Sequence, residues 1–222
     1  MDTASWNRAR EAVVAAALPH VPFDGWTGRA LVAGARAAGM EAADAQRLFA
    51  RGPIEAIEVY SAMADRAMAE AVAALDPETK VRDRIAAGIH ARLDFAAPHK
   101  EAMRRATNML ALPHNVPTGL RLLYRTVDAL WYAAGDRATD FNHYTKRAIL
   151  AAICSATFLY WFNDRSIDHA ATLSFLDRRL DEHGRLHGAM ERLRKRVEGL
   201  PNPFLFAERF RPDRRRGRRG TL

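Results

Sequence analysis

The chain has 222 residues, 49% of them hydrophobic, and it can bury a sizeable core as one compact unit or as one domain with a small appended module. Its single cysteine, Cys154, excludes a disulfide framework and a Cys-rich zinc site, and a reducing cytosol fits best. The formal net charge of +8 suggests nucleic acid or an anionic membrane as a partner, but seven arginines in residues 208–222 carry most of it. Residues 1–10 are too polar for a signal peptide, so we expect none.

Helical patterns begin close to the N-terminus. Alanine-rich stretches with apolar residues three and four apart recur almost throughout, and no segment alternates apolar and polar residues as a half-buried strand does. We therefore predict an all-α fold. The first three helices are expected over residues 6–18, 27–38 and 42–50, where Thr27 can cap the second helix. Together they form a helix-turn-helix-like N-terminal unit, residues 1–52.

A larger helical bundle is expected over residues 53–184. Its first helices are predicted over 54–75, 78–95, 99–110 and 117–134. The next helix contains residues 148–162, an apolar run shorter than the roughly 20 residues that a membrane span needs. We expect this helix to be buried on all sides at the centre of the bundle. A last helix starts near Asp168.

Residues 185–222 have a different character. Apolar residues fall on one face of a strongly basic helix, and phenylalanines and an arginine-rich stretch follow it. Such a segment gains about 1 kcal/mol per basic residue near anionic lipid, so we predict reversible contact with a membrane surface. A solvated tail is the simpler alternative. The residues expected to contact the membrane are Leu193, Val197, Phe204, Phe206, Arg194 and Arg196.

The order of a three-helix unit followed by a larger bundle resembles the TetR family of ligand-binding repressors. In that family the third helix enters the DNA major groove, where basic and polar side chains are needed. Residues 41–47 offer Glu41 and Asp44 against a single basic residue, Arg47. We therefore expect a TetR-like scaffold without nucleic acid as a partner, and keep a TetR-type DNA-binding transcriptional regulator as the alternative.

Residues 112–147 carry the most specific motifs of the chain. Four short strings stand out there: Leu112-Pro-His-Asn-Val-Pro117, Val127-Asp-Ala-Leu-Trp131, Ala134-Gly-Asp136 and Thr139-Asp-Phe-Asn142 followed by Tyr144-Thr145. A fifth, Phe23-Asp-Gly-Trp26-Thr27, lies far upstream. They resemble the ubiquinone-biosynthesis accessory lipid-binding family, whose members in mitochondria and proteobacteria have a TetR-like fold. The resemblance covers most of residues 10–180, and the lack of a recognisable transit peptide favours the bacterial branch.

This resemblance implies a non-catalytic protein that binds an isoprenoid quinone precursor or a phospholipid. It implies presentation of that lipid to a demethoxyubiquinone hydroxylase of the di-iron type, or to an equivalent ring hydroxylase. It further implies a homodimer that is cytoplasmic and peripheral on the inner face of the bacterial cytoplasmic membrane. The residues that the resemblance suggests for docking the partner are Asp128, Trp131, Tyr132, Tyr124 and His114.

The helix over residues 117–134 carries two neighbouring stripes. A stripe with three-four spacing should face the core: Leu120, Leu123, Val127, Leu130 and Ala134. The second stripe contains Asp128 and Trp131, and an exposed Trp is a suitable docking anchor because it supplies a large contact area. An ordinary half-buried Trp is the alternative. Asn115 is expected to cap this helix, and Asp140 to pair with Lys146 or Arg147.

The helix over residues 148–162 mixes small and aromatic side chains on several faces. The small residues leave room for an isoprenoid chain, although the same pattern is also that of an ordinary core. With the family resemblance, we predict a lipid cavity. Its candidate walls are Met103, Met109, Leu110, Leu112, Ile149, Ile153, Thr157, Phe158 and Trp161.

Motifs for catalysis and for metal are weak in this sequence. His183 and His187 are spaced as a pair of ligands on one helix face, but no Glu-x-x-His motif of a di-iron bundle occurs. Phosphate-binding glycine loops and nucleophile elbows are also missing. We therefore expect no cofactor, no metal and no enzymatic activity, and an enzyme of ring modification is the remaining alternative.

Overall fold

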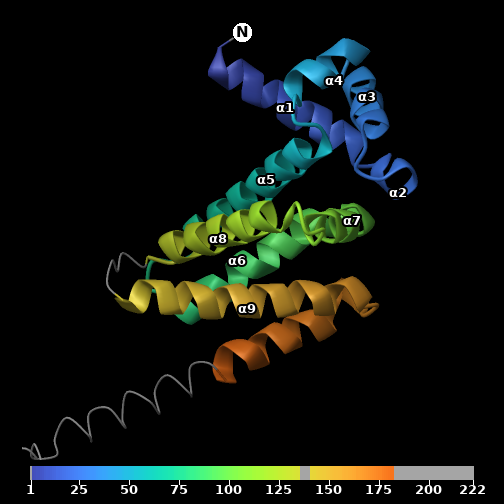
Figure 1. Ribbon diagram of the computed structural model, residues 1–222. Helices are drawn as coiled ribbons and strands as arrows, with labels where there is room; N and C mark the ends of the chain where they lie inside the picture. The colour runs from blue at the N-terminus through green and yellow to red at the C-terminus, as the bar shows by residue number, and fades with distance from the viewer. Residues whose placement is uncertain (1, 136–140, 183–222) are drawn as a thin grey trace, which may run out of the picture. The chain divides into compact units, whose positions relative to one another are not determined.

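A computed structural model of the chain describes residues 2–135 and 141–182. The chain divides into two compact units, residues 1–180 and 181–222, and nearly all described residues belong to the first. Every regular element in the described ranges is a helix (Figure 1), which confirms the predicted all-α fold. None of these helices is both long and apolar enough to cross a lipid bilayer.

Residues 2–52 form a group of helices made of α1 (Thr3–Ala17), α2 (Val21–Asp24), α3 (Gly28–Ala37) and α4 (Ala42–Leu48). Thr27 caps α3 as predicted, since its hydroxyl accepts a hydrogen bond from the Ala30 backbone N–H at 3.3 Å. The single turn α2 was not predicted, because it contains Pro22 and a pattern of four residues is too short to recognise. α3 lies tightly on α1 since Gly34 has no side chain there. A Cβ at that position would lie 2.5 Å from the Val13 carbonyl oxygen.

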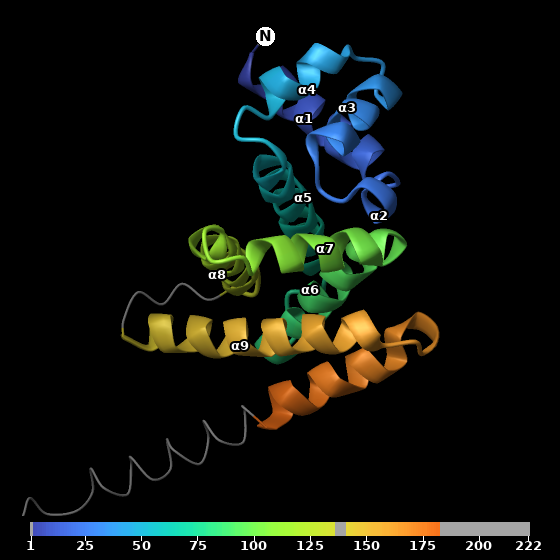
Figure 2. The ribbon, with the colours of Figure 1, turned by 45° about the vertical axis from the view of Figure 1, so that its right-hand side comes forward.

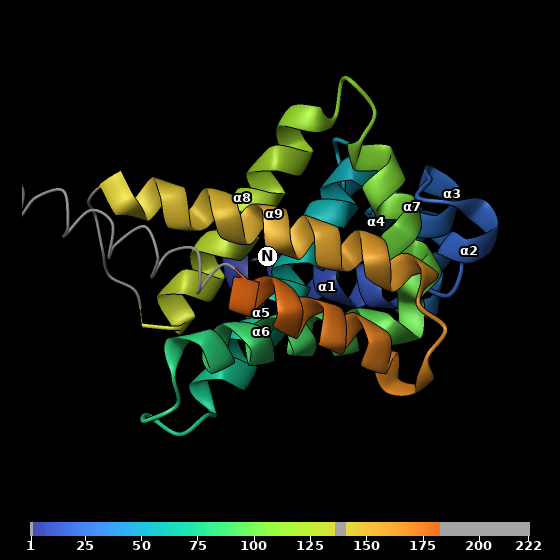
Figure 3. The ribbon, with the colours of Figure 1, turned by 90° about the horizontal axis from the view of Figure 1, so that it is seen from below.

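α5 (Pro53–Ala73) leads from this group into the bundle, as Figures 1 and 2 show. The chain continues through α6 (Val81–Ala96), a 3-10 turn at Ala97–His99, α7 (Lys100–Leu110), α8 (Val116–Ala133) and α9 (Phe141–Asn163). After a second 3-10 turn at Ile167–His169, residues 170–182 are helical, and the part up to residue 180 lies beside α9 (Figure 3). The helices predicted within residues 2–135 and 141–182 therefore exist, with ends that differ by a few residues.

Buried apolar side chains gather into two clusters. The first cluster fills the space between α1, α3, α4 and the start of α5, and it includes Val13, Ala35 and Ile57. The second cluster lies between α5, α6, α8, α9 and residues 170–180, and it includes Met68, Leu130, Trp161 and Leu176. Trp26 connects the loop before α3 to α7, because its indole N–H donates to the Ala102 carbonyl oxygen at 2.9 Å.

α9 is not buried on all sides, so this prediction was wrong. Leu159 is 59% exposed and Tyr160 is 40% exposed, and Ala148 and Ala152 are exposed as well. α8 contacts α9 on one side, and residues 170–180 cover another, as the views in Figures 1 and 3 agree. An apolar run rich in alanine shows that a helix can be buried, but it does not show that neighbours surround it.

Candidate lipid cavity and docking surface

A cavity of about 250 Å³ opens between α5, α6, α7, α8 and α9. Its walls are mainly apolar and include Ile57, Met103, Ala106, Leu110, Leu122, Leu123, Phe158, Leu159 and Phe162. Ile57 and Ala106 belong to the first core cluster and Phe162 to the second, while Met103 packs against both. The cavity therefore lies at the seam between the two clusters, where neither fills the space.

Three of the nine predicted lipid-binding residues, Met103, Leu110 and Phe158, line this cavity. The other six do not line it. Leu112 is 46% exposed, and Met109 is half-buried against the first cluster. Three others on α9, Ile149, Ile153 and Trp161, contribute to the second cluster or pack on it, and Thr157 on the same helix is fully buried. The Thr157 hydroxyl is engaged locally, since it donates to the Ile153 carbonyl oxygen at 2.8 Å.

The polar side chains of the cavity wall include Ser61 on α5 and Arg92 on α6, two helices that the sequence analysis did not consider for this site. Thr107 on α7, Thr126 on α8 and Ser155 on α9 line it as well. Arg92 on α6 is 6% exposed, and its guanidinium donates to the Ser61 hydroxyl at 3.2 Å and the Ser61 carbonyl oxygen at 3.4 Å. It also forms an ion pair with Asp65, whose carboxylate accepts a hydrogen bond from the Thr126 hydroxyl at 2.8 Å. We call Ser61, Asp65, Arg92 and Thr126 the buried polar cluster. Pairing of its opposite charges offsets the cost of burying them.

Tyr60 lies on α5 beside this cluster and also lines the cavity. Its ring packs between Trp26, with centroids 6.0 Å apart, and Phe95, with centroids 5.7 Å apart. Burial raises the pKa of Tyr60 to about 12, although the nearby Arg92 charge acts in the opposite direction. The phenol is therefore protonated at neutral pH and is a hydrogen-bond donor.

The inward face of α8 differs from the predicted stripe. Val127, Leu130 and Ala134 are buried as predicted and Leu123 is half-buried, but Leu120 is 63% exposed, so its placement in the core was wrong. Leu122 and Thr126 are buried in addition. The buried side of α8 is thus centred one helix position away from the predicted stripe.

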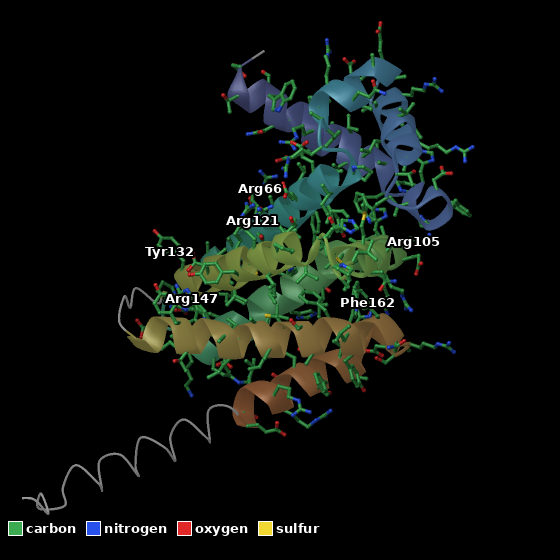
Figure 4. All side chains as sticks on the ribbon, in the orientation of Figure 1. Arg66, Arg105, Arg121, Tyr132, Arg147 and Phe162 are labelled. Carbon is green, nitrogen blue, oxygen red and sulfur yellow. The ribbon has the colours of Figure 1, made fainter. Side chains whose placement is uncertain are left out.

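Four of the predicted docking residues lie on α8. Asp128 is bound by the Arg147 guanidinium at 2.7 Å, and Trp131 lies under the Lys146 ammonium, 5.5 Å from the ring centroid. Trp131 is half-buried, so the prediction that it is exposed was wrong. The structure agrees with the alternative of an ordinary half-buried tryptophan. Tyr132 is 71% exposed and points outward near Arg147, as Figure 4 shows.

Two further candidates lie towards the start of α8. Tyr124 is 47% exposed, and His114 is exposed in the turn that precedes the helix. The N-terminal position of Asn115 is as predicted, but its side chain does not cap α8. It donates to the Met109 carbonyl oxygen at 3.0 Å and so ties this turn back to α7.

Other predicted residues lie outside the described residues. They are Asp140, His183, His187 and the membrane-contact set Leu193, Val197, Phe204, Phe206, Arg194 and Arg196. Within residues 2–135 and 141–182, no group of His, Cys, Asp and Glu side chains has the arrangement of a metal site. On α4, the helix that would read DNA in a repressor, Arg47 pairs with Asp44.

The fold belongs to a known class of helical proteins. A crystal structure of a TetR transcriptional regulator from Nitrosomonas europaea superposes with a TM-score of 0.63, over 78% of this chain and 96% of that one. Their sequences are 23% identical, so the likeness concerns the fold alone. The protein is therefore an all-α protein with a TetR-like fold, as the sequence analysis predicted.

Sequence relatives define the family. Ubiquinone biosynthesis protein COQ9 of Homo sapiens is 32% identical over 214 residues, which cover 93% of this chain and 67% of the human protein. The protein of the same name from Drosophila melanogaster is 30% identical over 88% of this chain and 60% of its own length. The COQ9 family model matches residues 116–187, which contain α8 and α9. This chain belongs to the COQ9 family.

Proposed function

We propose that this protein is a non-catalytic carrier in ubiquinone biosynthesis, which binds an isoprenoid quinone precursor in the cavity at the seam. The observation that carries the proposal is a mainly apolar cavity in the bundle of a COQ9 family member. Concave apolar sites with a few polar groups are the usual form of small-molecule sites in proteins. A phospholipid chain is the other cargo of similar character.

The size of the cavity fits partial enclosure of such a lipid. Ligand sites commonly measure about 300–1,000 Å³, and the cavity of about 250 Å³ lies just below this range. Leu159, which is 59% exposed, and the half-buried Leu110 and Leu123 form its outer wall. A long isoprenoid chain would continue past these side chains and remain within reach of a membrane or a partner.

We further propose that α8 docks the ring hydroxylase to which the lipid is presented. Asp128 lies four residues after Tyr124, and Trp131 and Tyr132 lie three and four residues after Asp128, so the four share one side of the helix. The exposed Tyr132 and Tyr124 supply amphipathic contact area, and the Asp128–Arg147 pair and Lys146 keep Trp131 in place between them.

The remaining parts of the proposal concern assembly and location. The exposed surface of α9, to which Tyr160 belongs, suits a homodimer interface, as is usual for the last bundle helices of TetR-like proteins. Residues 185–222 would hold the protein on the inner face of a bacterial cytoplasmic membrane. The relatives named above are mitochondrial proteins.

A cavity-filling variant tests the carrier function. Ala106 is buried and lines the cavity, so Ala106→Leu places extra volume where the lipid would lie. Native mass spectrometry of protein purified from cells should detect co-purified isoprenoid lipid with the wild type and much less with this variant. Ala152→Leu, on the exposed side of α9, is the matched control and should retain the lipid. Wild-type protein that co-purifies with no isoprenoid lipid and does not bind liposomes would contradict the proposal.

Docking is tested separately with a purified di-iron demethoxyubiquinone hydroxylase. Tyr132→Lys places a charge on an exposed position and should weaken association about tenfold or more, without loss of fold. Ile167→Lys, at a position 85% exposed in a turn away from α8, is the control. If both variants bound the hydroxylase with equal affinity, this side of α8 would not be its docking surface.

A further inference from the structure

Two buried donors at the cavity have no hydrogen-bond partner in the described part of the chain. They are the Tyr60 hydroxyl and the Arg92 Nε, and both residues line the cavity. Tyr60 is 2% exposed and Arg92 is 6% exposed, so bulk water does not satisfy them. Buried polar groups are nearly always paired in folded proteins, because an unpaired one loses its hydration without compensation. These donors are therefore expected to gain a partner when the cavity is occupied.

The charges around the two donors select the kind of partner. The positive charge of Arg92 is already balanced by Asp65, which in turn accepts from Thr126. Among the residues that line the cavity in the described ranges, Arg92 is the only one with a full charge. An anionic ligand group would meet the Asp65 carboxylate close behind Arg92 and would find no excess positive charge. A neutral oxygen acceptor has neither disadvantage.

The positions of these residues also give the ligand a direction. The donors lie on α5 and α6 in the interior, whereas the outer wall at Leu159 is exposed and apolar. An apolar cavity of roughly 150 Å³ holds a benzene-sized ring. The volume of about 250 Å³ therefore accommodates one ring with a short piece of attached chain.

We infer that the inner end of the cavity, at Tyr60 and Arg92, is a recognition site for the neutral oxygen-bearing head of an amphiphile whose apolar chain leaves past Leu159. The inference rests on the proposed carrier function and narrows its cargo. A quinone carbonyl or an aryl ether oxygen accepts from the Tyr60 hydroxyl or from Arg92 Nε and meets no opposing charge. A fatty acid or a phospholipid headgroup would be excluded from this end. The donors thus select a head, while the apolar walls accept many chains.

Three ligands with the same ten-carbon chain test this inference: decyl-benzoquinone, decylbenzene and 4-decylbenzoate. Their affinities are measured by displacement of the neutral fluorescent probe N-phenyl-1-naphthylamine from the full-length protein. One hydrogen bond to a neutral acceptor corresponds to about fivefold in affinity, so the wild type should bind the quinone at least that much more tightly than decylbenzene. The benzoate should bind no better than decylbenzene.

Tyr60→Phe removes the phenol oxygen and keeps the ring between Trp26 and Phe95. This variant should lose most of the preference for the quinone and bind decylbenzene as the wild type does. Tyr160→Phe is the matched control, because Tyr160 is 40% exposed, stacks on Phe175 and lies outside the cavity wall. Thermal melts without ligand should show Tyr60→Phe to be at least as stable as the wild type, since the hydroxyl it removes has no partner.

The outcomes separate the recognition site from the carrier function. Wild-type protein that binds the quinone and decylbenzene equally well would overturn the recognition site and leave the carrier intact, and this comparison needs no variant. If the benzoate bound most tightly of the three, the inference that the site selects a neutral ligand head would be wrong. A wild type that binds none of the three compounds would instead sink the carrier function together with the inference.

Discussion

The interior of the first core cluster and the seam between the two clusters are packed in opposite ways. At the α1–α3 contact, there is no room for a single additional carbon at Gly34. At the seam, a volume of about 250 Å³ remains open, and a charged pair and two unpartnered donors are buried beside it. Close packing maximises stability, whereas an unfilled and partly polar interior lowers it. Under the proposed carrier function, the open seam is the binding region and the closely packed first cluster is its scaffold.

The largest effect is expected at the seam, from loss of one partner of the buried ion pair. Asp65→Ala leaves the Arg92 guanidinium buried without its carboxylate and should lower the free energy of unfolding by about 3–5 kcal/mol. Urea-induced unfolding followed by circular dichroism measures this change. The double variant Asp65→Leu/Arg92→Met removes both charges and should recover most of the loss. A single variant that loses less than about 1 kcal/mol would show that water screens the pair.

A somewhat smaller effect is expected in the first cluster. Gly34→Ala introduces a Cβ 2.5 Å from the Val13 carbonyl oxygen, a backbone atom that cannot rotate away, and should destabilise the protein by about 1–3 kcal/mol. Gly28→Ala, at the exposed start of the same helix with no atom within 4 Å, is the control and should be close to neutral. Equal stability of the two variants in thermal unfolding would mean that α1 and α3 separate readily.

Extra side-chain volume should affect stability differently in the seam cavity and in the interior of the first cluster. Ala106→Leu fills part of the seam cavity and should change the free energy of unfolding by less than about 1 kcal/mol. Ala35→Leu adds the same volume to a fully buried position of the first cluster and should cost about 1–3 kcal/mol. Calorimetry of the two variants provides the measurement. A penalty for Ala106→Leu as large as that for Ala35→Leu would mean that the cavity closes in solution.

Local signals in the sequence predicted most of the fold. Proline and glycine mark the helix ends, as at Gly52-Pro53 before α5, and Thr27 caps α3 as its side-chain chemistry suggests. The motifs in residues 112–147 identified the family correctly. Helical periodicity was less reliable for predicting which side of a helix is buried, because the exposed Leu120 and the buried Thr126 both depart from the predicted stripe of α8. Which helices pack over a given face depends on contacts that are distant in the sequence.

The cavity wall was largely missed for the same reason. Trp161 and Ile153 were expected to line it, yet they fill the second cluster, because an apolar helix does not show where neighbouring side chains leave a gap. One signal was available on α6. Arg92 falls among Ile85, Ile89 and Leu93 on the buried face of that helix, and a charge at a core position requires a partner or a function. It pairs with Asp65, which follows the buried Ala64 on α5.

The smallest effect on stability is expected at the Asp164 carboxylate, which has several hydrogen-bond partners, unlike the two donors at the seam. The Asp164 carboxylate accepts from the backbone N–H and hydroxyl of Ser166, at 2.8 and 2.6 Å, and from those of Thr172, at 2.9 and 2.5 Å. Burial alone would raise the pKa of Asp164, but these hydrogen bonds outweigh it and hold the pKa well below the ordinary value of 3.8.

Because the pKa of Asp164 is lower in the folded than in the unfolded chain, its contribution to stability is complete above the ordinary carboxyl pKa and is lost as the pH falls further. Asp164→Asn should therefore be less stable than the wild type at pH 7, with the difference shrinking below about pH 4. Melting temperatures between pH 3 and pH 7 provide the measurement. A constant difference over this range would show that the hydrogen bonds do not depend on the charge.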